Sequence, residues 1–170
     1  MKEDIELLVE AGATCGESPI WDPEARLLWW TDTATKSVFS WDPATKTASS
    51  RSTDRTVHAV ARGGQGRLVL LCADGIYLLD KGSSTARLLC DPERGRAGML
   101  PDDGTVDPAG RFVFNTCNGD KFDDPSGSIY SIDVEGKLLT LDSGLPCPTA
   151  WPFPLTAGPC TWPRCSPTGY

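Results

Sequence analysis

Short apolar runs alternate with polar turns along most of this chain of 170 residues. The runs LLWW, LVLL and FVF each follow an arginine, and turns such as DPATK, GGQG, DPAG and DPSG separate the runs. Runs of this length, rich in Val, Leu, Ile and aromatic residues and bounded by Gly, Pro and Asp, are typical of β-strands. No stretch shows the period of a helix. The pattern therefore predicts an all-β protein.

The strands repeat on one plan, in which a turn that ends in arginine joins an entry strand to a strongly apolar strand. The three copies begin with GESPIWDPEAR, VHAVARGGQGR and DDGTVDPAGR, and their arginines, Arg26, Arg67 and Arg111, lie 41 and 44 residues apart. This spacing is close to the ~40–45 residues of a four-stranded propeller blade. We expect a β-propeller with about three blades in residues 1–146, and a single β-sandwich is the structural alternative.

The charge of the chain narrows the class of partner. A net charge of −7 and an isoelectric point near 4.6 leave no basic patch for nucleic acid or for an anionic membrane surface. The acidic first residues contain no apolar run of signal-peptide length, and no stretch reaches the ~20 apolar residues of a membrane span. We expect a cytoplasmic protein whose partner is a small molecule, and the sequence identifies no protein partner.

The number and spacing of the cysteines argue against a fold that is stabilised by disulfides or by zinc. The seven cysteines are odd in number and form no C-x-x-C pair. Neither a zinc knuckle nor a disulfide framework is therefore predicted. We expect reduced, mostly packed thiols in the main body of the chain.

The repeat stops in the last 24 residues, 147–170, which hold six of the 14 prolines and no acidic residue. Proline cannot donate to a strand ladder, so these residues do not predict a fourth blade. When CPTAWPFPLTAGPCTWPRCSPTGY is read one nucleotide out of step with freely chosen third bases, it becomes PNGLAFPPDGRTLYLAEMLANRV, a fourth copy of the plan. We expect residues 147–170 to be an aberrant, disordered tail produced by a frameshift, and a genuine tail with its own role is the alternative.

A polar residue recurs nine positions before each turn arginine. Glu17, His58 and Asp102 occupy this position, and in the re-read tail it is the Asn of PNG. Equivalent positions of successive blades lie at equivalent heights around the central channel of a propeller, so these side chains are expected to converge there. Carboxylate and amide oxygens suit a hard divalent cation such as Ca²⁺, and one histidine does not make the set a zinc site.

Several motifs together resemble the family of regucalcin (senescence marker protein), gluconolactonase and luciferin-regenerating enzyme. GESPIWDPEARLLWWTD is similar to the opening of that family, ADGIYLLD to its second blade and DDGTVDPAGRF to its third, so the likeness spans roughly residues 15–145. The re-read PNGLAFPPDGRTLY resembles its fourth blade. The resemblance implies a six-bladed propeller, of which this chain carries the N-terminal half, and the metal-dependent opening of a sugar lactone.

The resemblance also implies roles for individual residues. Glu17 matches a glutamate that binds the divalent metal, with Ca²⁺ as the first choice and Zn²⁺, Mg²⁺ or Mn²⁺ as alternatives. The other metal ligands of the family, the Asn of PNG and a later Asp that also serves as the base, have no counterpart in this chain. Asp102 falls where the family has a substrate-binding Asn, and Asp120 where some members have a substrate-contacting Glu. Leu100 replaces a frequent arginine, which leaves the identity of the lactone open, and His58 has no family role to carry over.

Plainer interpretations stay open for each candidate. Glu17 is otherwise a surface carboxylate before a Ser-Pro turn, Asp102 part of an Asx turn in PDDG, Asp120 a solvated acid in a polar loop and His58 a solvent-facing side chain. We expect the N-terminal part of a metal-dependent sugar lactonase, truncated and inactive as this chain. The alternative is a non-catalytic propeller scaffold, which gives no reason for acids at the channel.

Overall fold

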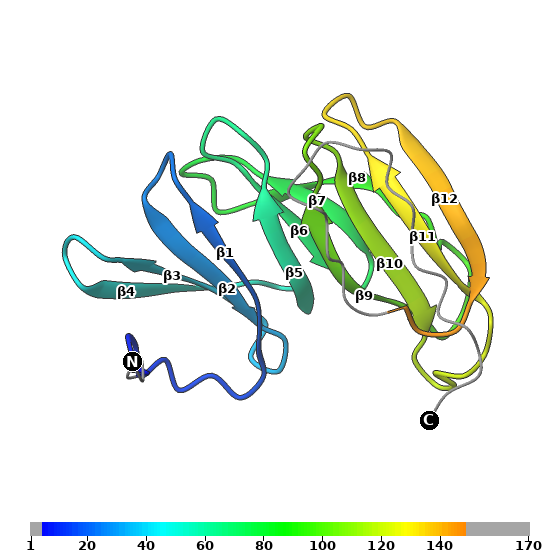
Figure 1. Cartoon of the computed structure of the whole chain (residues 1–170), viewed down its shortest axis with the longest axis horizontal. Helices are drawn as coiled ribbons and strands as arrows, with labels where there is room; N and C mark the ends of the chain where they lie inside the picture. The colour runs from blue at the N-terminus through cyan, green and yellow to red at the C-terminus, as the bar shows by residue number, and fades with distance from the viewer. Residues whose placement is uncertain (1–4, 149–170) are drawn as a thin grey trace.

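The protein is built from β-strands alone in the part that the structure describes. The computed structural model describes residues 5–148, which form twelve strands in three antiparallel sheets of four (Figure 1). A search of these residues for a helix long and apolar enough to cross a membrane finds none. The all-β prediction is confirmed. The predicted tail lies outside the described residues, apart from Cys147 and Pro148.

Each sheet is a meander in which strands that are consecutive in sequence pair side by side. Blade 1 contains β1 (Gly16–Asp22), β2 (Leu27–Asp32), β3 (Ser37–Asp42) and β4 (Thr47–Ser52). Blade 2 contains β5 (Val57–Arg62), β6 (Leu68–Cys72), β7 (Gly75–Leu79) and β8 (Ala86–Cys90). Blade 3 contains β9 (Met99–Val106), β10 (Phe112–Asn118), β11 (Gly127–Ile132) and β12 (Leu138–Leu145). Each turn arginine directly precedes the second strand of its blade, as the repeat predicted.

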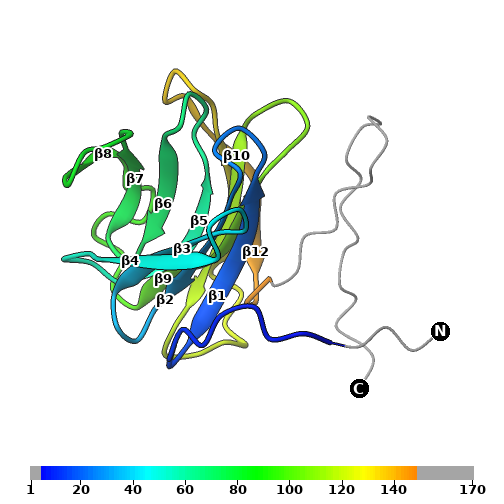
Figure 2. The same cartoon turned by 90° about the vertical axis from the view of Figure 1, so that its left-hand side faces the viewer.

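The three sheets stand side by side with their first strands nearest to one another (Figures 1 and 2). The strand β5 contacts both β1 and β9, which belong to the neighbouring sheets. Sheets arranged in this way are blades of a propeller rather than the two layers of a sandwich. The propeller prediction is therefore confirmed.

The central blade packs on both neighbours through alternate residues of the same strands. In β6, Leu68 and Leu70 belong to the cluster shared with blade 1, whereas Val69 and Leu71 belong to the cluster shared with blade 3. Successive residues of a strand point to opposite faces of the sheet, so an uninterrupted apolar run covers both interfaces. This explains why LVLL has no polar position and why β6 and β7 are buried throughout.

The two blade interfaces are filled differently. Aromatic rings of blade 3 stack in a row against blade 2, with centroids 5.6 Å apart for Phe112 and Phe114 and 5.3 Å for Phe114 and Tyr130. Between blades 1 and 2, by contrast, a cavity of about 480 Å³ opens beside Trp29 and Val38. Blade 2 is therefore packed more completely against blade 3 than against blade 1.

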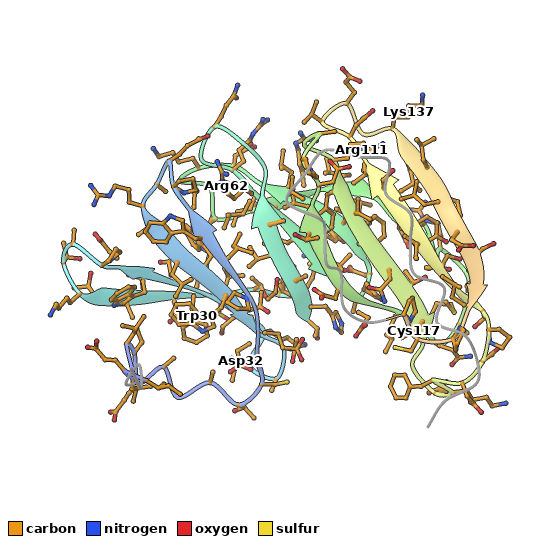
Figure 3. All side chains as sticks on the ribbon, viewed as in Figure 1. Trp30, Asp32, Arg62, Arg111, Cys117 and Lys137 are labelled. Atoms are coloured by element: carbon orange, nitrogen blue, oxygen red, sulfur yellow. The ribbon has the colours of Figure 1, made fainter. Side chains whose placement is uncertain are left out.

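The turn arginines and the site candidates lie at opposite ends of the blades. Arg62, Arg111 and Lys137 lie at one end, and Asp32 and Cys117 at the other (Figure 3). At the arginine end, Arg111 donates through Nε to the Asp107 carboxylate at 2.7 Å, closing the DPAGR turn. Arg62 lies 3.3 Å from Asp22 and so joins blade 2 to blade 1. The site candidates therefore lie at the end of the blades that is opposite to these contacts.

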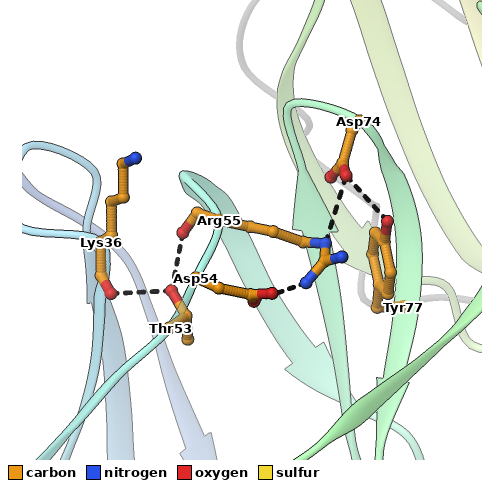
Figure 4. A network of polar contacts seen from close by, with 6 residues as sticks. All are labelled: Lys36, Thr53, Asp54, Arg55, Asp74 and Tyr77. Atoms are coloured by element: carbon orange, nitrogen blue, oxygen red, sulfur yellow. Dashed lines mark hydrogen bonds and ion pairs between the residues drawn. The ribbon is translucent and has the colours of Figure 1, made fainter.

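A polar network holds the linker between blades 1 and 2 at the site end (Figure 4). The Thr53 hydroxyl lies 2.7 Å from the Lys36 carbonyl oxygen of blade 1 and 2.6 Å from the carbonyl oxygen of Arg55. The Arg55 guanidinium donates to Asp74 at 3.2 Å and lies over the ring of Tyr77, 4.4 Å from its centroid. Tyr77 donates to the same carboxylate at 2.9 Å. The linker therefore fixes the second blade against the first.

Candidate functional site

The three polar residues that recur nine positions before the turn arginines lie on neighbouring strands. Glu17 lies in β1, His58 in β5 and Asp102 in β9, the three neighbouring first strands. Burial lowers the pKa of His58, while the carboxylates of Glu17 and Asp102 act in the opposite direction. The strands that carry the two acids, β1 and β9, lie on either side of the strand that carries His58.

Each of these residues sits at an irregularity in its strand. The pairing of β1 with β2 shifts between Glu17 and Ile20. The pairing of β5 with β6 shifts around His58, and residues 102 and 103 of β9 both lie opposite Asn115 of β10. A β-bulge of this kind adds an unpaired residue and turns its side chain away from the regular alternation. The first strand of every blade therefore has a bulge at its polar residue or directly after it.

The chain around Glu17 is held by a buried carboxylate. Asp32 is fully buried and accepts hydrogen bonds from the backbone N–H of Thr14 at 2.9 Å and of Cys15 at 3.1 Å. Burial alone opposes ionisation, but hydrogen bonds from Thr14, Cys15 and Thr35 offset it and lower the pKa of Asp32. The Glu17 side chain itself is exposed, with the Cys15 thiol 3.4 Å from its Oε1. Glu17 thus presents a carboxylate from a segment that Asp32 fixes.

Asp102 accepts a hydrogen bond from a side-chain amide that was not among the predicted site residues. The buried Asn115 donates through Nδ2 to the Asp102 carboxylate at 3.3 Å, and its Oδ1 accepts from the backbone N–H of Asp103 at 3.1 Å. Burial raises the pKa of Asp103, with a smaller contribution from the charge of Asp102. The signal for Asn115 was an amide inside the apolar strand FVFN. The Asx-turn alternative for Asp102 is wrong, because PDDG lies within β9 rather than in a turn.

Asp120 lies in the loop after β10. Its backbone N–H donates to Asn118 at 3.0 Å, and a Cβ added at Gly98 would come within 3.1 Å of its Oδ2. Leu100, which stands where the resemblance implies an arginine, packs over Gly119 so closely that a Cβ there would lie 2.3 Å from its Cδ1. The structure thus gives Leu100 a packing role at this end of blade 3.

The residues present match the donor chemistry of a hard cation but supply only part of a site. Carboxylate oxygens of Glu17 and Asp102 are the ligand type that Ca²⁺ prefers. Within residues 5–148, however, no three His, Cys, Asp or Glu side chains come close enough together to hold a metal ion. The other ligands that the resemblance implies have no counterpart in this chain. A complete coordination shell therefore requires donors from beyond this part of the chain.

The cysteines do not form a metal or disulfide framework in the described part. All five described cysteines are free, with Cys72 and Cys117 buried and Cys15 exposed. Burial raises the pKa of Cys72 and of Cys117 to about 12, so both thiols are protonated and inert near neutral pH. Cys15 is exposed and therefore departs from the expectation of packed thiols.

Comparisons with known proteins agree with the motifs. A family model described as SMP-30/Gluconolactonase/LRE-like region matches residues 15–153. Regucalcin of Pongo abelii is 30% identical over 112 residues, 66% of this chain and 38% of that protein. The 6-deoxy-6-sulfogluconolactonase of Pseudomonas putida is 27% identical over 141 residues, 83% of this chain and 48% of that enzyme.

Solved structures share the fold. The calcium-binding protein regucalcin from Agrobacterium tumefaciens superposes with a TM-score of 0.72 at 23% identity, covering 81% of this chain and 46% of that structure. The chain spans less than half the length of each of these relatives.

Proposed function

Because the chain belongs to the SMP-30/gluconolactonase/LRE-like family, we propose that it forms part of a divalent-metal-dependent hydrolase of sugar lactones. The observation that carries this proposal is the placement of Glu17, His58 and Asp102 on the neighbouring first strands of three successive blades. The names of two relatives, a sulfogluconolactonase and a calcium-binding regucalcin, support the substrate class and the metal.

In this proposal Glu17 is a metal ligand, and Asp102 and Asp120 bind the hydroxyl groups of the sugar lactone. Ca²⁺ is the first choice, with Zn²⁺, Mg²⁺ and Mn²⁺ as alternatives. When bound, such a cation polarises the lactone carbonyl and stabilises the oxyanion that develops. Asp102 is oriented by Asn115 and, as a carboxylate, accepts hydrogen bonds from substrate hydroxyls.

The base that takes a proton from the attacking water lies outside residues 5–148 in this proposal, as do the remaining metal ligands. We therefore expect the chain of 170 residues to be inactive alone. The proposal includes the frameshift after Pro146, which replaces the ligand-bearing PNG segment by residues 147–170.

The test compares the 170-residue chain with the product of the same gene read in the other frame from codon 147 onward. We expect Ca²⁺-dependent, EDTA-sensitive hydrolysis of gluconolactone by the longer product and none by the shorter. In the longer product, Glu17→Gln lowers the rate by ~100-fold, the scale of losing a metal-site partner. Glu24→Gln, an exposed acid of the same blade, leaves the rate unchanged.

Two outcomes contradict the proposal. Hydrolysis by the 170-residue chain contradicts the dependence on residues beyond the three blades. A longer product that is folded and opens none of a panel of aldonolactones contradicts the lactonase assignment and favours the non-catalytic scaffold.

A further inference from the structure

The bulge that follows Glu17 and the bulge at His58 are linked by one side chain. Ser18 follows Glu17 within the β1 bulge, and its Oγ lies 3.1 Å from the backbone N–H nitrogen of Val60 and 3.2 Å from the carbonyl oxygen of Val60. Val60 lies in β5 of the next blade, two residues after His58. A hydroxyl both donates and accepts, so Ser18 acts here like a strand partner between two separate sheets.

The backbone of Ser18 is also unusual. Its φ of 53° lies in the left-handed region, which residues with a Cβ rarely adopt. A conformation of this kind persists when its surroundings fix it, and such positions cluster at functional sites. The two contacts with Val60 are the surroundings that fix Ser18.

We propose that Ser18 is a positioning residue, which fixes the segment of Glu17 relative to the segment of His58 by hydrogen-bonding the first strand of blade 1 to the first strand of blade 2. The inference rests on the proposed function only in making Glu17 a metal ligand. The link between the two strands is independent of it. The second link between β1 and β5, from Arg62 to Asp22, lies at the opposite end of the blades and does not constrain the bulge.

His58 gives a direct readout, because it is the only histidine of the chain. Its imidazole proton signal can be followed by NMR in the full 170-residue chain at about pH 8, where an unperturbed imidazole is neutral. Glu17→Gln is expected to move this signal in the wild-type background. The same substitution is expected to move it by less than half as much in a Ser18→Ala background.

Two matched variants separate the hydroxyl from other effects. Ser18→Gly keeps the left-handed conformation without strain but lacks the hydroxyl, so it is expected to behave like Ser18→Ala. Ser37→Ala removes a half-buried hydroxyl of the same blade that donates locally to the Thr35 carbonyl oxygen, and the response to Glu17→Gln is expected to stay intact. An undiminished response in Ser18→Ala, or in Ser18→Gly, overturns the proposal.

A measurement on the wild type keeps the proposal testable if the variants do not fold. The Val60 amide proton is expected to exchange with solvent at least ~10-fold more slowly than an unprotected amide, because Ser18 accepts from it. Exchange at the unprotected rate overturns the proposal. If the NMR coupling is present but no lactonase activity is found in the longer gene product, the proposed function fails and the positioning role stands.

Discussion

At the scale of single residues, His58 reports on the acids around it. Burial lowers its pKa, and Glu17 and Asp102 raise it. Removing one carboxylate leaves the effect of burial less opposed. We expect Glu17→Gln and Asp102→Asn each to lower the pKa of His58 further, as measured by NMR titration of its imidazole protons. The exposed Glu24→Gln is the control, and an equal shift in that variant would show that net charge rather than proximity is responsible.

The depressed pKa of His58 also makes stability depend on pH. The folded pKa lies below the ordinary value of 6.5, so the unfolded chain binds the proton more readily. The contribution of His58 to stability is therefore present above about pH 6.5 and is lost as the pH falls through the folded pKa. Urea unfolding at about pH 8 and pH 5 is expected to show a larger loss of stability for the wild type than for His58→Gln. Equal losses would contradict this assignment.

At the scale of the strand, the bulge of β9 depends on Asn115. Asn115→Ala removes the partner of the Asp103 N–H and the donor to Asp102. Leaving buried polar groups without partners costs about 1–3 kcal/mol, so the free energy of unfolding is expected to fall by that amount. Chemical denaturation measures the change, and a cost near zero would show that water replaces the amide.

The aromatic row of blade 3 is expected to dominate the interface with blade 2. Phe114 is completely buried between two stacked rings, whereas Phe122 is 63% exposed. Phe114→Ala is expected to cost about 3–5 kcal/mol by loss of burial and creation of a cavity. Phe122→Ala is expected to stay within about 0.5 kcal/mol of the wild type. Comparable costs for both substitutions, measured in urea, would mean that the blades do not pack as described.

The strands were predictable from the sequence, but their irregularities were not. Arg67 and LVLL placed β6 because apolar residues and turns follow a repeat. The bulge at His58 changes the pairing by one residue and leaves no trace in composition. Asp102 is an example of the resulting error, because PDDG is typical of a turn and yet lies inside β9. Asn115 is marked in the sequence only as an amide inside the apolar strand FVFN, and its role in holding that bulge follows from its hydrogen bonds to Asp102 and Asp103.

At the scale of the molecule, the three blades differ in how completely they are packed. Blade 2 is buried between its neighbours, whereas every residue of β4 is exposed and a cavity of about 480 Å³ lies on the inner side of blade 1. Local opening follows such differences in packing. We expect backbone amides of β6 and β7 to exchange most slowly and those of β4 most rapidly, as measured by hydrogen exchange. Uniform protection across the three sheets would contradict this order.

The repeat revealed this arrangement of sheets because each blade carries the same turn before its second strand. The relative order of the blades follows from their order in the chain. What the repeat does not reveal is how well each interface is filled, since that depends on pairs such as Trp29 and Val38 on one side and Phe112 and Phe114 on the other.

The two-sided packing of β6 constrains how this sequence can change in length. Loss of one residue there would exchange the faces of all the side chains that follow, so each would meet the neighbour for which its shape is unsuited. Insertions and deletions in such a blade are therefore expected to accumulate in its turns, such as GGQG, and to spare LVLL.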